Sequence, residues 1–517
     1  MDAIGFSRRQ LLTAGAGAAL LAGCATGVRR GSTDSAQAPD EASAIATRLD
    51  RITWGVNEAE VSAARRVGFV PYLDGQLNAS IGPPLAGDLQ DRIERMTISG
   101  TTLQALVLRM EEQRKAADAV VGDDAKKAAQ QAYQQQMNQL AHEAASRHLL
   151  RALYSPHQVL ERMTWFWLNH FSVHQYKSNL RAMVADYDDT IRSRALGRFR
   201  DLVGAVVHHP AMLRYLDNEQ NAVGHINENH ARELMELHTL GVDAGYTQAD
   251  VQELARVLTG VGVNLSGSAP KVRRELQAFY VRDGLFEFNP NRHDFGPKRL
   301  LGQPIAAQGL AELDEALDRL CRHPVAATFI CRKLAGYWMS DDPPPAVVAA
   351  MVRTFRESDG QIARVLEVLF NAEGFWRAHK FKDPMRYVTS AIRAAYDRRA
   401  ILNTQPVLGW LARLGEPLYG RQTPDGYPLD SRAWSSAGQM ATRFEISRAI
   451  GSASAGLFRP DEPGARDVPA FPQLATPLYY EWREKTLGAA TRTALGQAAS
   501  PQEWNTFLLA SPEFMQG

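Results

Sequence analysis

Charged side chains recur along residues 227–241 at spacings that fit one face of a helix. Glu233 and Glu236 are one helical turn apart, and Arg232 precedes them. Two carboxylates so placed can hold a divalent metal, or one of them can act as a general base beside the arginine. His238, in the same block, is a further candidate for proton transfer. The alternative is that Arg232 pairs with a neighbouring glutamate and the stripe only stabilises the helix.

Aromatic side chains surround two histidines in residues 163–174. His170 and His174 are four residues apart, so on a continuous helix both imidazoles would share a face and could ligate one metal. Asn169 is a candidate for substrate binding in the same segment. The alternative is a buried histidine near a helix end, with the aromatic rings filling the core.

A third block, residues 289–298, places a histidine and an aspartate next to each other before a Gly-Pro pair. His293 and Asp294 in a tight turn could present an imidazole and a carboxylate to a cleft, as functional loops do. Lys298 closes the block and could bind substrate. The alternative is a structural turn stabilised by the aspartate, with the glycine and proline setting the backbone.

These blocks together predict a site with three kinds of residue. The candidate catalytic residues are Glu233, Glu236, His238, His293 and Asp294. The candidates for substrate binding are Asn169, Arg232 and Lys298. The candidate ligands of a divalent metal are His170, Glu233 and Glu236. The sequence contains no H-E-x-x-H, G-x-S-x-G or P-loop motif, so the blocks do not define one reaction.

The N-terminus carries an export signal. Arg8 and Arg9 precede a run of Leu, Ala and Gly that ends at Cys24. A twin arginine before a mildly apolar run predicts export by the twin-arginine (Tat) machinery, which carries folded proteins. The Leu-Ala-Gly-Cys ending resembles a lipobox, which is cleaved before a lipidated cysteine. An uncleaved membrane anchor is the alternative, but the apolar run is shorter than the ~20 residues that span a bilayer.

We therefore expect residues 1–23 to be a signal peptide and residues 24–42, rich in Gly, Ser, Asp and Pro, to be a flexible tether. The membrane would be reached through a lipid on Cys24. Ala25, rather than an aspartate, follows that cysteine and favours the outer membrane. The predicted location is thus the cell envelope, with the protein facing the periplasm.

Helix signals dominate residues 43–517, which contain no clear linker, so we predict a mainly α fold and one large helical domain. Residues 101–154, rich in Ala, Gln, Lys and Glu and interrupted at Gly122, predict a helical hairpin insertion. The best strand signal is a small β-hairpin within residues 278–301. Helix N-termini are predicted where a capping side chain precedes an acid or amide by three residues. These patterns begin at Asn57, Ser155, Thr247 and Ser500.

Composition excludes several classes of protein. The 517 residues include 58 Lys+Arg and 57 Asp+Glu, for a net charge of +1, which argues against a nucleic-acid binder. Three cysteines cannot form a disulfide scaffold, and no C-x-x-C is present. Cys321 and Cys331 are ten residues apart in a segment with helical character, too far for a disulfide, and are expected to be core thiols.

The same blocks resemble the bacterial domain-of-unknown-function 1800 family (DUF 1800). The resemblance implies a mainly helical fold, frequent export, and a frequent genomic neighbour that is an exported, sulfatase-like protein. It implies no reaction. The matching segments are residues 49–55, 165–171, 209–218, 227–241, 245–251, 293–298, Trp434 and 508–514.

Two hypotheses for function follow. In the first, the chain is an envelope enzyme, such as a metal-assisted hydrolase, that uses the candidate site residues. In the second, it is a non-catalytic lipoprotein that docks or stabilises an exported sulfatase-like partner, and its polar blocks hold an internal scaffold.

Overall fold

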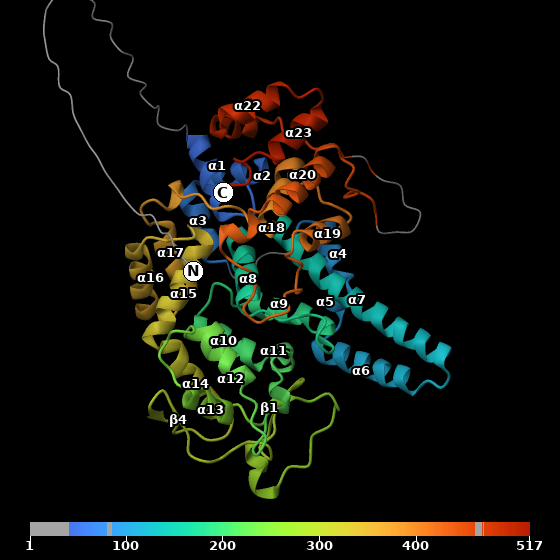
Figure 1. Cartoon of the computed structure of the whole chain (residues 1–517), viewed down its shortest axis with the longest axis vertical. Coiled ribbons are helices and arrows are strands. Elements are labelled where there is room, and N and C mark those ends of the chain that lie inside the picture. Colours follow the sequence, from blue (N-terminus) through green and yellow to red (C-terminus); the bar gives the residue numbers. More distant parts are fainter. Residues whose placement is uncertain (1–40, 80–84, 461–467, 469) are drawn as a thin grey trace, which may run out of the picture. The chain divides into compact units, whose positions relative to one another are not determined.

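The fold is mainly helical, as predicted, with two small antiparallel sheets. The computed structural model describes residues 41–79, 85–460, 468 and 470–517 (Figure 1). The predicted signal peptide, with Arg8 and Arg9, and the tether from Cys24 to residue 40 lie outside these residues. Residues 41–517 form one compact unit. Within the described ranges, no helix is long and apolar enough to cross a membrane.

The first half of the chain is built almost entirely from helices. They are α1 (Glu41–Ile52), α2 (Glu58–Val67), α3 (Phe69–Leu77), α4 (Asp88–Glu94), α5 (Thr97–Gly100), α6 (Leu103–Ala119), α7 (Asp123–Tyr154), α8 (Gln158–His170), η1 (Leu180–Ala182), α9 (Val184–Arg192), α10 (Phe199–His208), α11 (Pro210–Tyr215), η2 (Asn218–Gln220), α12 (Asn229–Glu233), η3 (Leu234–Thr239) and α13 (Gln248–Val257).

The second half begins with strands and continues with helices. The strands are β1 (Val261–Val263), β2 (Val281–Asp283), β3 (Phe286–Phe288), β4 (Arg299–Leu300) and β5 (Gln303–Pro304). The helices are η4 (Arg274–Phe279), α14 (Ala311–Arg322), α15 (Pro324–Trp338), α16 (Pro345–Glu357), α17 (Ile362–Phe370), η5 (Phe375–Arg377), α18 (Pro384–Tyr396), α19 (Gln405–Arg413), η6 (Ser431–Trp434), α20 (Ala437–Gly451), η7 (Tyr479–Arg483), α21 (Glu484–Thr486), α22 (Ala489–Gly496) and α23 (Pro501–Leu509).

The start of the helical domain differs from the predicted boundary. Helix α1 begins at Glu41, so residues 41–42 belong to the domain and not to the tether. The reason is local composition, because the alanines of this segment favour helix more than the glycine and serine upstream favour coil. The predicted boundary at residue 43 is therefore two residues late.

Three of the four predicted helix caps are confirmed. Asn57, Thr247 and Ser500 each accept the backbone N–H three residues on, and the Thr247 pair with Asp250 is reciprocal. The cap predicted at Ser155 is wrong. Its hydroxyl accepts the N–H of His157 instead, two residues on, and α8 begins only at Gln158.

Helices α6 and α7 pack against each other as the predicted hairpin (Figure 1). Only the last third of α7 is continuously buried, from about Ala141 to Leu153. The turn and the helix ends beside it are exposed, and the single buried side chain between Lys115 and Lys127 is Ala117. The hairpin is thus anchored at its base and solvated at its tip.

Helix α8 is buried along almost its whole length and contacts α3, α7 and α9. Of its charged members, Glu161 pairs with Arg192 at 2.6 Å. Arg162 lies against the Trp338 ring at 3.9 Å and donates to the carbonyl of Arg51. An all-round apolar helix predicts this central position.

The predicted β-hairpin is confirmed as β2 and β3, which pair antiparallel with Val281 opposite Phe288. Strand β1 adds to the other edge of β3, and β4 pairs with β5. The loop between β3 and β4 carries residues 289–298. The small sheets therefore serve to hold one of the candidate blocks.

Segments far apart in sequence meet at α1. The side chain of Trp482 donates to Thr47 at 2.9 Å, and Arg483 lies 3.6 Å from the Asp50 carboxylate. Arg51 donates to the backbone carbonyl of Gly517. Helix α1 is thus completed by contacts with residues 479–517.

Candidate functional site

The block 227–241 folds into α12 followed by the π-helix η3 (Leu234–Thr239). The wider π turn is stabilised by the Thr239 hydroxyl, which donates to the Leu234 carbonyl at 2.7 Å. Single π turns inside helices are frequent at functional sites because they turn carbonyls and side chains away from the regular helix positions. The predicted polar stripe is therefore real, but its register changes after Glu233.

Asparagines fix the chain that leads into α12. Asn221 accepts the N–H of Asn227 at 3.0 Å and donates to the carbonyl of Ala255 at 2.8 Å. The Asn229 side chain donates to the Leu216 carbonyl at 3.2 Å. These amides satisfy backbone groups in a loop whose own backbone pairing includes the bridge between Ala222 and His225. The asparagines at the start of the block 227–241 thus have a structural role.

His170 links three helices through its ring. Lys333 Nζ of α15 lies 2.8 Å from its Nδ1, and its Nε2 lies 3.0 Å from the carbonyl oxygen of His238. Because a carbonyl can only accept, Nε2 carries the proton and Nδ1 accepts from the lysine. Burial lowers the pKa of His170 well below its usual value, and the nearby Lys333 adds to this effect, so the ring is neutral.

Both ring nitrogens of His170 therefore already have hydrogen-bond partners, and neither is left for a metal. His174 does not share its helix face, because α8 ends at His170, and the expectation of an i, i+4 histidine pair is wrong. Among the residues that the structure describes, no three His, Cys, Asp or Glu side chains are grouped closely enough to hold a metal. The predicted ligands His170, Glu233 and Glu236 are thus not gathered into one set.

Glu233 is half-buried and differs from its charged neighbours. Within the described part of the chain it makes no hydrogen bond or ion pair, whereas Arg232 bonds Glu228 at 3.0 Å and lies 3.5 Å from Glu236. Burial raises the pKa of Glu233, and the Glu236 carboxylate adds to this effect. Arg232 lowers the pKa of Glu233, and the Asp425 carboxylate raises it. The candidate substrate binder Arg232 is thus already paired, as the alternative interpretation held.

Lys333 faces the same loop as Glu233 does. Burial lowers the pKa of Lys333 to about 8, against the opposing effect of Asp425. That one carboxylate therefore acts on both the lysine and Glu233. We call Glu233, Glu236, Asp425 and Lys333 the Glu233 cluster. The raised pKa of Glu233 and the lowered pKa of Lys333 are both shifted toward the range in which acid–base chemistry operates near neutral pH.

The loop that carries Asp425 is clamped by two family blocks. The Asn169 side chain donates to the Tyr427 carbonyl at 2.9 Å and accepts the Tyr427 N–H at 2.5 Å. Tyr215 donates to the Gln422 carbonyl at 2.8 Å. Gly426 has a φ of +76°, and an added Cβ would lie 2.1 Å from the Asn169 carbonyl oxygen, so a side chain has no room there. Asn169, predicted to bind substrate, instead positions this loop.

His238 is fully buried, and burial lowers its pKa to about 3. Neither ring nitrogen has a hydrogen-bond partner among the described residues. A neutral, enclosed ring of this kind is not placed to exchange protons with a substrate. Its backbone carbonyl, which accepts from His170, is the part of the residue that the site uses.

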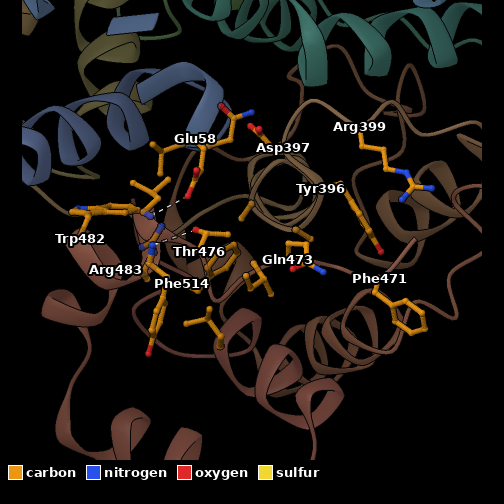
Figure 2. A pocket seen from close by; sticks show the side chains of 18 residues that line it. Glu58, Tyr396, Asp397, Arg399, Phe471, Gln473, Thr476, Trp482, Arg483 and Phe514 are labelled. Carbon is orange, nitrogen blue, oxygen red and sulfur yellow. Dashed lines mark hydrogen bonds between the residues drawn. The ribbon is translucent and has the colours of Figure 1, made fainter. Parts of the chain in front are cut away.

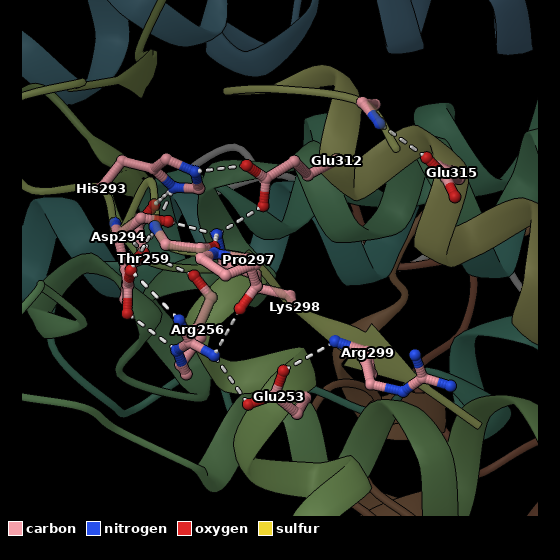
Figure 3. Close-up of polar contacts among 12 residues, drawn as sticks. Glu253, Arg256, Thr259, His293, Asp294, Pro297, Lys298, Arg299, Glu312 and Glu315 are labelled. Atoms are coloured by element: carbon pink, nitrogen blue, oxygen red, sulfur yellow. Dashed lines mark hydrogen bonds and ion pairs between the residues drawn. The ribbon is translucent and has the colours of Figure 1, made fainter. Parts of the chain in front are cut away.

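The block 289–298 forms a closed polar network (Figure 3). His293 Nε2 lies 3.1 Å from Glu312 Oε1, and Lys298 Nζ lies 2.7 Å from Glu312 Oε2, with all three side chains buried. The other ring nitrogen of His293 lies 2.8 Å from the carbonyl of Thr259, so it donates there. The pair of ring contacts uses both nitrogens and ties the loop to α13 and α14.

Asp294 of the same block pairs with Arg256 at 2.8 Å, and this guanidinium lowers the pKa of the carboxyl to about 2. Lys298 also donates to the carbonyl of Asp294. No member of the trio His293, Asp294 and Lys298 is left open to a substrate. The structure supports the alternative interpretation of this block, a stabilised turn, and separates it from the Glu233 cluster.

Two members of the Glu233 cluster were missed by the sequence analysis. Lys333 lies in an apolar helix about one hundred residues after Glu233, and nothing local marks it. Asp425 lies in a Gly- and Pro-rich loop, residues 415–429, and that composition is the one signal that could have drawn attention to it. Cys321 and Cys331 are free and buried, as predicted.

Comparisons with known proteins bear on the whole chain. Neither the curated proteins nor the solved structures contain a match. A family model described as "Protein of unknown function (DUF1800)" matches residues 47–516. This range includes every block from which the resemblance was drawn, apart from the N-terminal signal. The chain therefore belongs to the DUF1800 family.

Proposed function

We propose that this chain is an exported, lipid-anchored protein of the cell envelope and a hydrolase-like enzyme in which Glu233 transfers protons. In this reaction the Glu233 carboxylate takes a proton from a water molecule, whose oxygen attacks the substrate. The same group then returns the proton to the leaving group. Export by the Tat machinery through Arg8 and Arg9, and anchoring through Cys24, belong to the same proposal.

The observation that carries the catalytic part is the isolation of Glu233. The other candidate carboxylates of the family blocks are in ion pairs, whereas Glu233 has no partner among the described residues and is half-buried. Its raised pKa brings proton exchange closer to neutral pH. The Asp425 carboxylate raises the pKa of Glu233 further and also acts on Lys333.

The first test needs no substrate. In carbon NMR titrations of glutamate side chains, the wild type should contain one carboxyl group with a raised pKa that is missing in Glu233→Gln. Glu373→Gln is the matched control, because Glu373 is 96% exposed and remote from the blocks described here. A Glu233 carboxyl that titrates at the ordinary glutamate value of about 4.3 would contradict the proposal.

The second test measures turnover on a panel of nitrophenyl esters, phosphates, sulfates and glycosides. We expect Glu233→Gln to lose at least about 100-fold in kcat/KM, the usual contribution of a general base, while Glu373→Gln keeps its activity. A base works only when it is deprotonated. The acid limb of the pH profile should therefore lie above the ordinary pKa of a glutamate, which is about 4.3. Equal rates for wild type and Glu233→Gln would remove Glu233 from catalysis.

A second candidate function has its own supporting observation. The block 293–298 is used entirely for internal bonds, which fits a non-catalytic lipoprotein that supports a sulfatase-like partner. Co-purification of the two exported proteins at equal amounts, unchanged by Glu233→Gln, together with no turnover by either variant, would favour this function over the enzyme.

A further inference from the structure

Two neighbouring cavities lie outside the Glu233 cluster. One, of about 290 Å³, is lined by the start of α2, the end of α18 and the π-helix η7 (Figure 2). The other, of about 1050 Å³, continues along α22 and α23. Phe471, Gln473, Leu474 and Tyr479 line both, so the two form one groove. Taken separately, the two volumes lie close to the lower and upper ends of the range of small-molecule sites.

Aromatic rings on the walls of this groove face solvent. Phe471 is 61% exposed and Tyr480 is 56% exposed, and both line the larger cavity. Trp482 and Phe514 line the smaller one, but both of these side chains are buried. Large exposed rings gathered at one concave surface are uncommon on a protein that has nothing to bind there. They provide flat faces on which a ligand can stack.

Three side chains of the smaller cavity, two carboxylates and one amide, are each held by a hydrogen bond to one of their two polar atoms. Asn57 Oδ1 accepts the N–H of Glu60, Glu58 Oε1 accepts that of Leu478, and Asp397 Oδ1 accepts that of Ala59, at 2.9 to 3.1 Å. The second polar atom of Asn57, Glu58 and Asp397 has no hydrogen bond within the described residues. These groups are therefore oriented in advance and still able to bond a ligand.

Charges around the groove cancel. Three carboxylates, those of Glu58, Asp397 and Glu484, and three guanidinium groups, those of Arg399, Arg483 and Arg492, line the groove, so its lining has no formal net charge. An anionic or cationic ligand would find no net attraction here. An acyl chain would bury the free polar atoms without bonding them, at about 1–3 kcal/mol each. The groove suits a neutral ligand that has both hydroxyl groups and apolar faces.

We infer that this groove binds a neutral oligosaccharide. The apolar faces of the sugar rings stack on Phe471 and Tyr480, and the hydroxyl groups bond to the free atoms of Asn57, Glu58 and Asp397. Sugar hydroxyls donate and accept, so they match a wall that offers carboxylates and an amide together. This inference goes beyond the proposed enzyme and does not depend on Glu233.

The test uses the full chain with Cys24→Ser, titrated with hexamers of β-linked glucose, α-linked glucose and N-acetylglucosamine in calorimetry. At least one should bind, with a Kd that does not change between low and high salt. Phe471→Ala and Tyr480→Ala should each weaken binding by about fivefold to tenfold, in line with the energy of one aromatic contact. Tyr176→Ala, which removes a 61% exposed ring that lines neither cavity, is the control and should not change it.

No binding of any of the three hexamers overturns the inference, and so does binding that falls steeply with salt or that ignores both ring variants. Binding of a fatty acid or an apolar peptide that is lost in Phe471→Ala, without sugar binding, reassigns the groove and also overturns it. Glu233→Gln should bind the sugar as the wild type does, so a failure here and a failure of the proposed enzyme can be told apart.

Discussion

At Lys298 the family block ends in a buried ion pair whose loss should be costly. Its ammonium group lies 2.7 Å from a Glu312 carboxylate that also contacts His293. Lys298→Met leaves that carboxylate buried and short of one partner. We expect a loss of about 3–5 kcal/mol in the free energy of unfolding, measured with urea.

The matched variant combines Lys298→Met with Glu312→Gln. A neutral amide can donate its N–H to Nε2 of His293 and carries no charge to compensate, so the double variant should be more stable than Lys298→Met alone. If the two variants unfold at the same urea concentration, the network of Figure 3 is not what stabilises this loop.

Lys382 should make stability depend on pH. Burial lowers its pKa to about 7, even though the Asp50 carboxylate opposes this, while the unfolded chain keeps the ordinary value near 10.5. Between these values the unfolded state binds the extra proton, so raising the pH favours the folded state. Relative to Lys382→Met, the wild type should gain up to about 1.4 kcal/mol per pH unit above pH 7. If the free energies of unfolding of the two proteins, measured with urea, changed with pH in the same way, this prediction would be wrong.

The helical hairpin is the element best suited to shortening. Between Lys115 and Lys127 only Ala117 is buried, so replacing this stretch by a short glycine-containing turn removes little packing. We expect the melting temperature to change by only a few degrees, because about one small apolar side chain is lost. The comparison is a deletion of Ala141–Leu149 at the buried base, which should prevent folding. A large drop for the tip deletion would mean that the tip is in contact with the rest of the domain.

The elements show where sequence patterns were sufficient. The caps at Asn57, Thr247 and Ser500 depend on residues three apart, and the buried helix around Trp167 depends on local composition, so both could be predicted. The π-helix after Glu233 could not be predicted, because a single turn with i→i+5 hydrogen bonds is too short to leave a period of its own in the sequence. The end of α8 at His170, which separates it from His174, is set by tertiary contacts.

The candidate site could be predicted only in part, because sequence patterns are local and some of its residues come from distant segments. Glu233 stands in a helical pattern that marks it, but its neighbours Lys333 and Asp425 come from segments about one hundred and two hundred residues away. His293 and Asp294 had the residue types of a catalytic pair, and only their partners Glu312 and Arg256 reveal their structural role. Residue type therefore suggested catalytic roles for side chains whose partners in the fold make them structural.

For the molecule as a whole, the proposed lipidation at Cys24 is the part most easily tested. Cys24→Ser should move the protein from the membrane fraction to the soluble envelope fraction and abolish incorporation of labelled palmitate. Cys321→Ala is the control, because that thiol is buried in the core, and it should remain with the membranes. A Cys24→Ser protein that still sediments with membranes would argue against a lipid anchor at this position.

The contacts of α1 with residues 479–517 also set a minimum time for completing the domain during translation. About 430 residues separate Asp50 from Arg483, and at roughly 5–20 residues per second the ribosome needs on the order of 20 to 90 s to cover that distance. Throughout this interval the first helix of the domain has left the ribosome without the residues that complete it. A signal placed before α1 is therefore displayed long before its cargo can finish folding, and a translocase that accepts folded cargo has to wait at least that long.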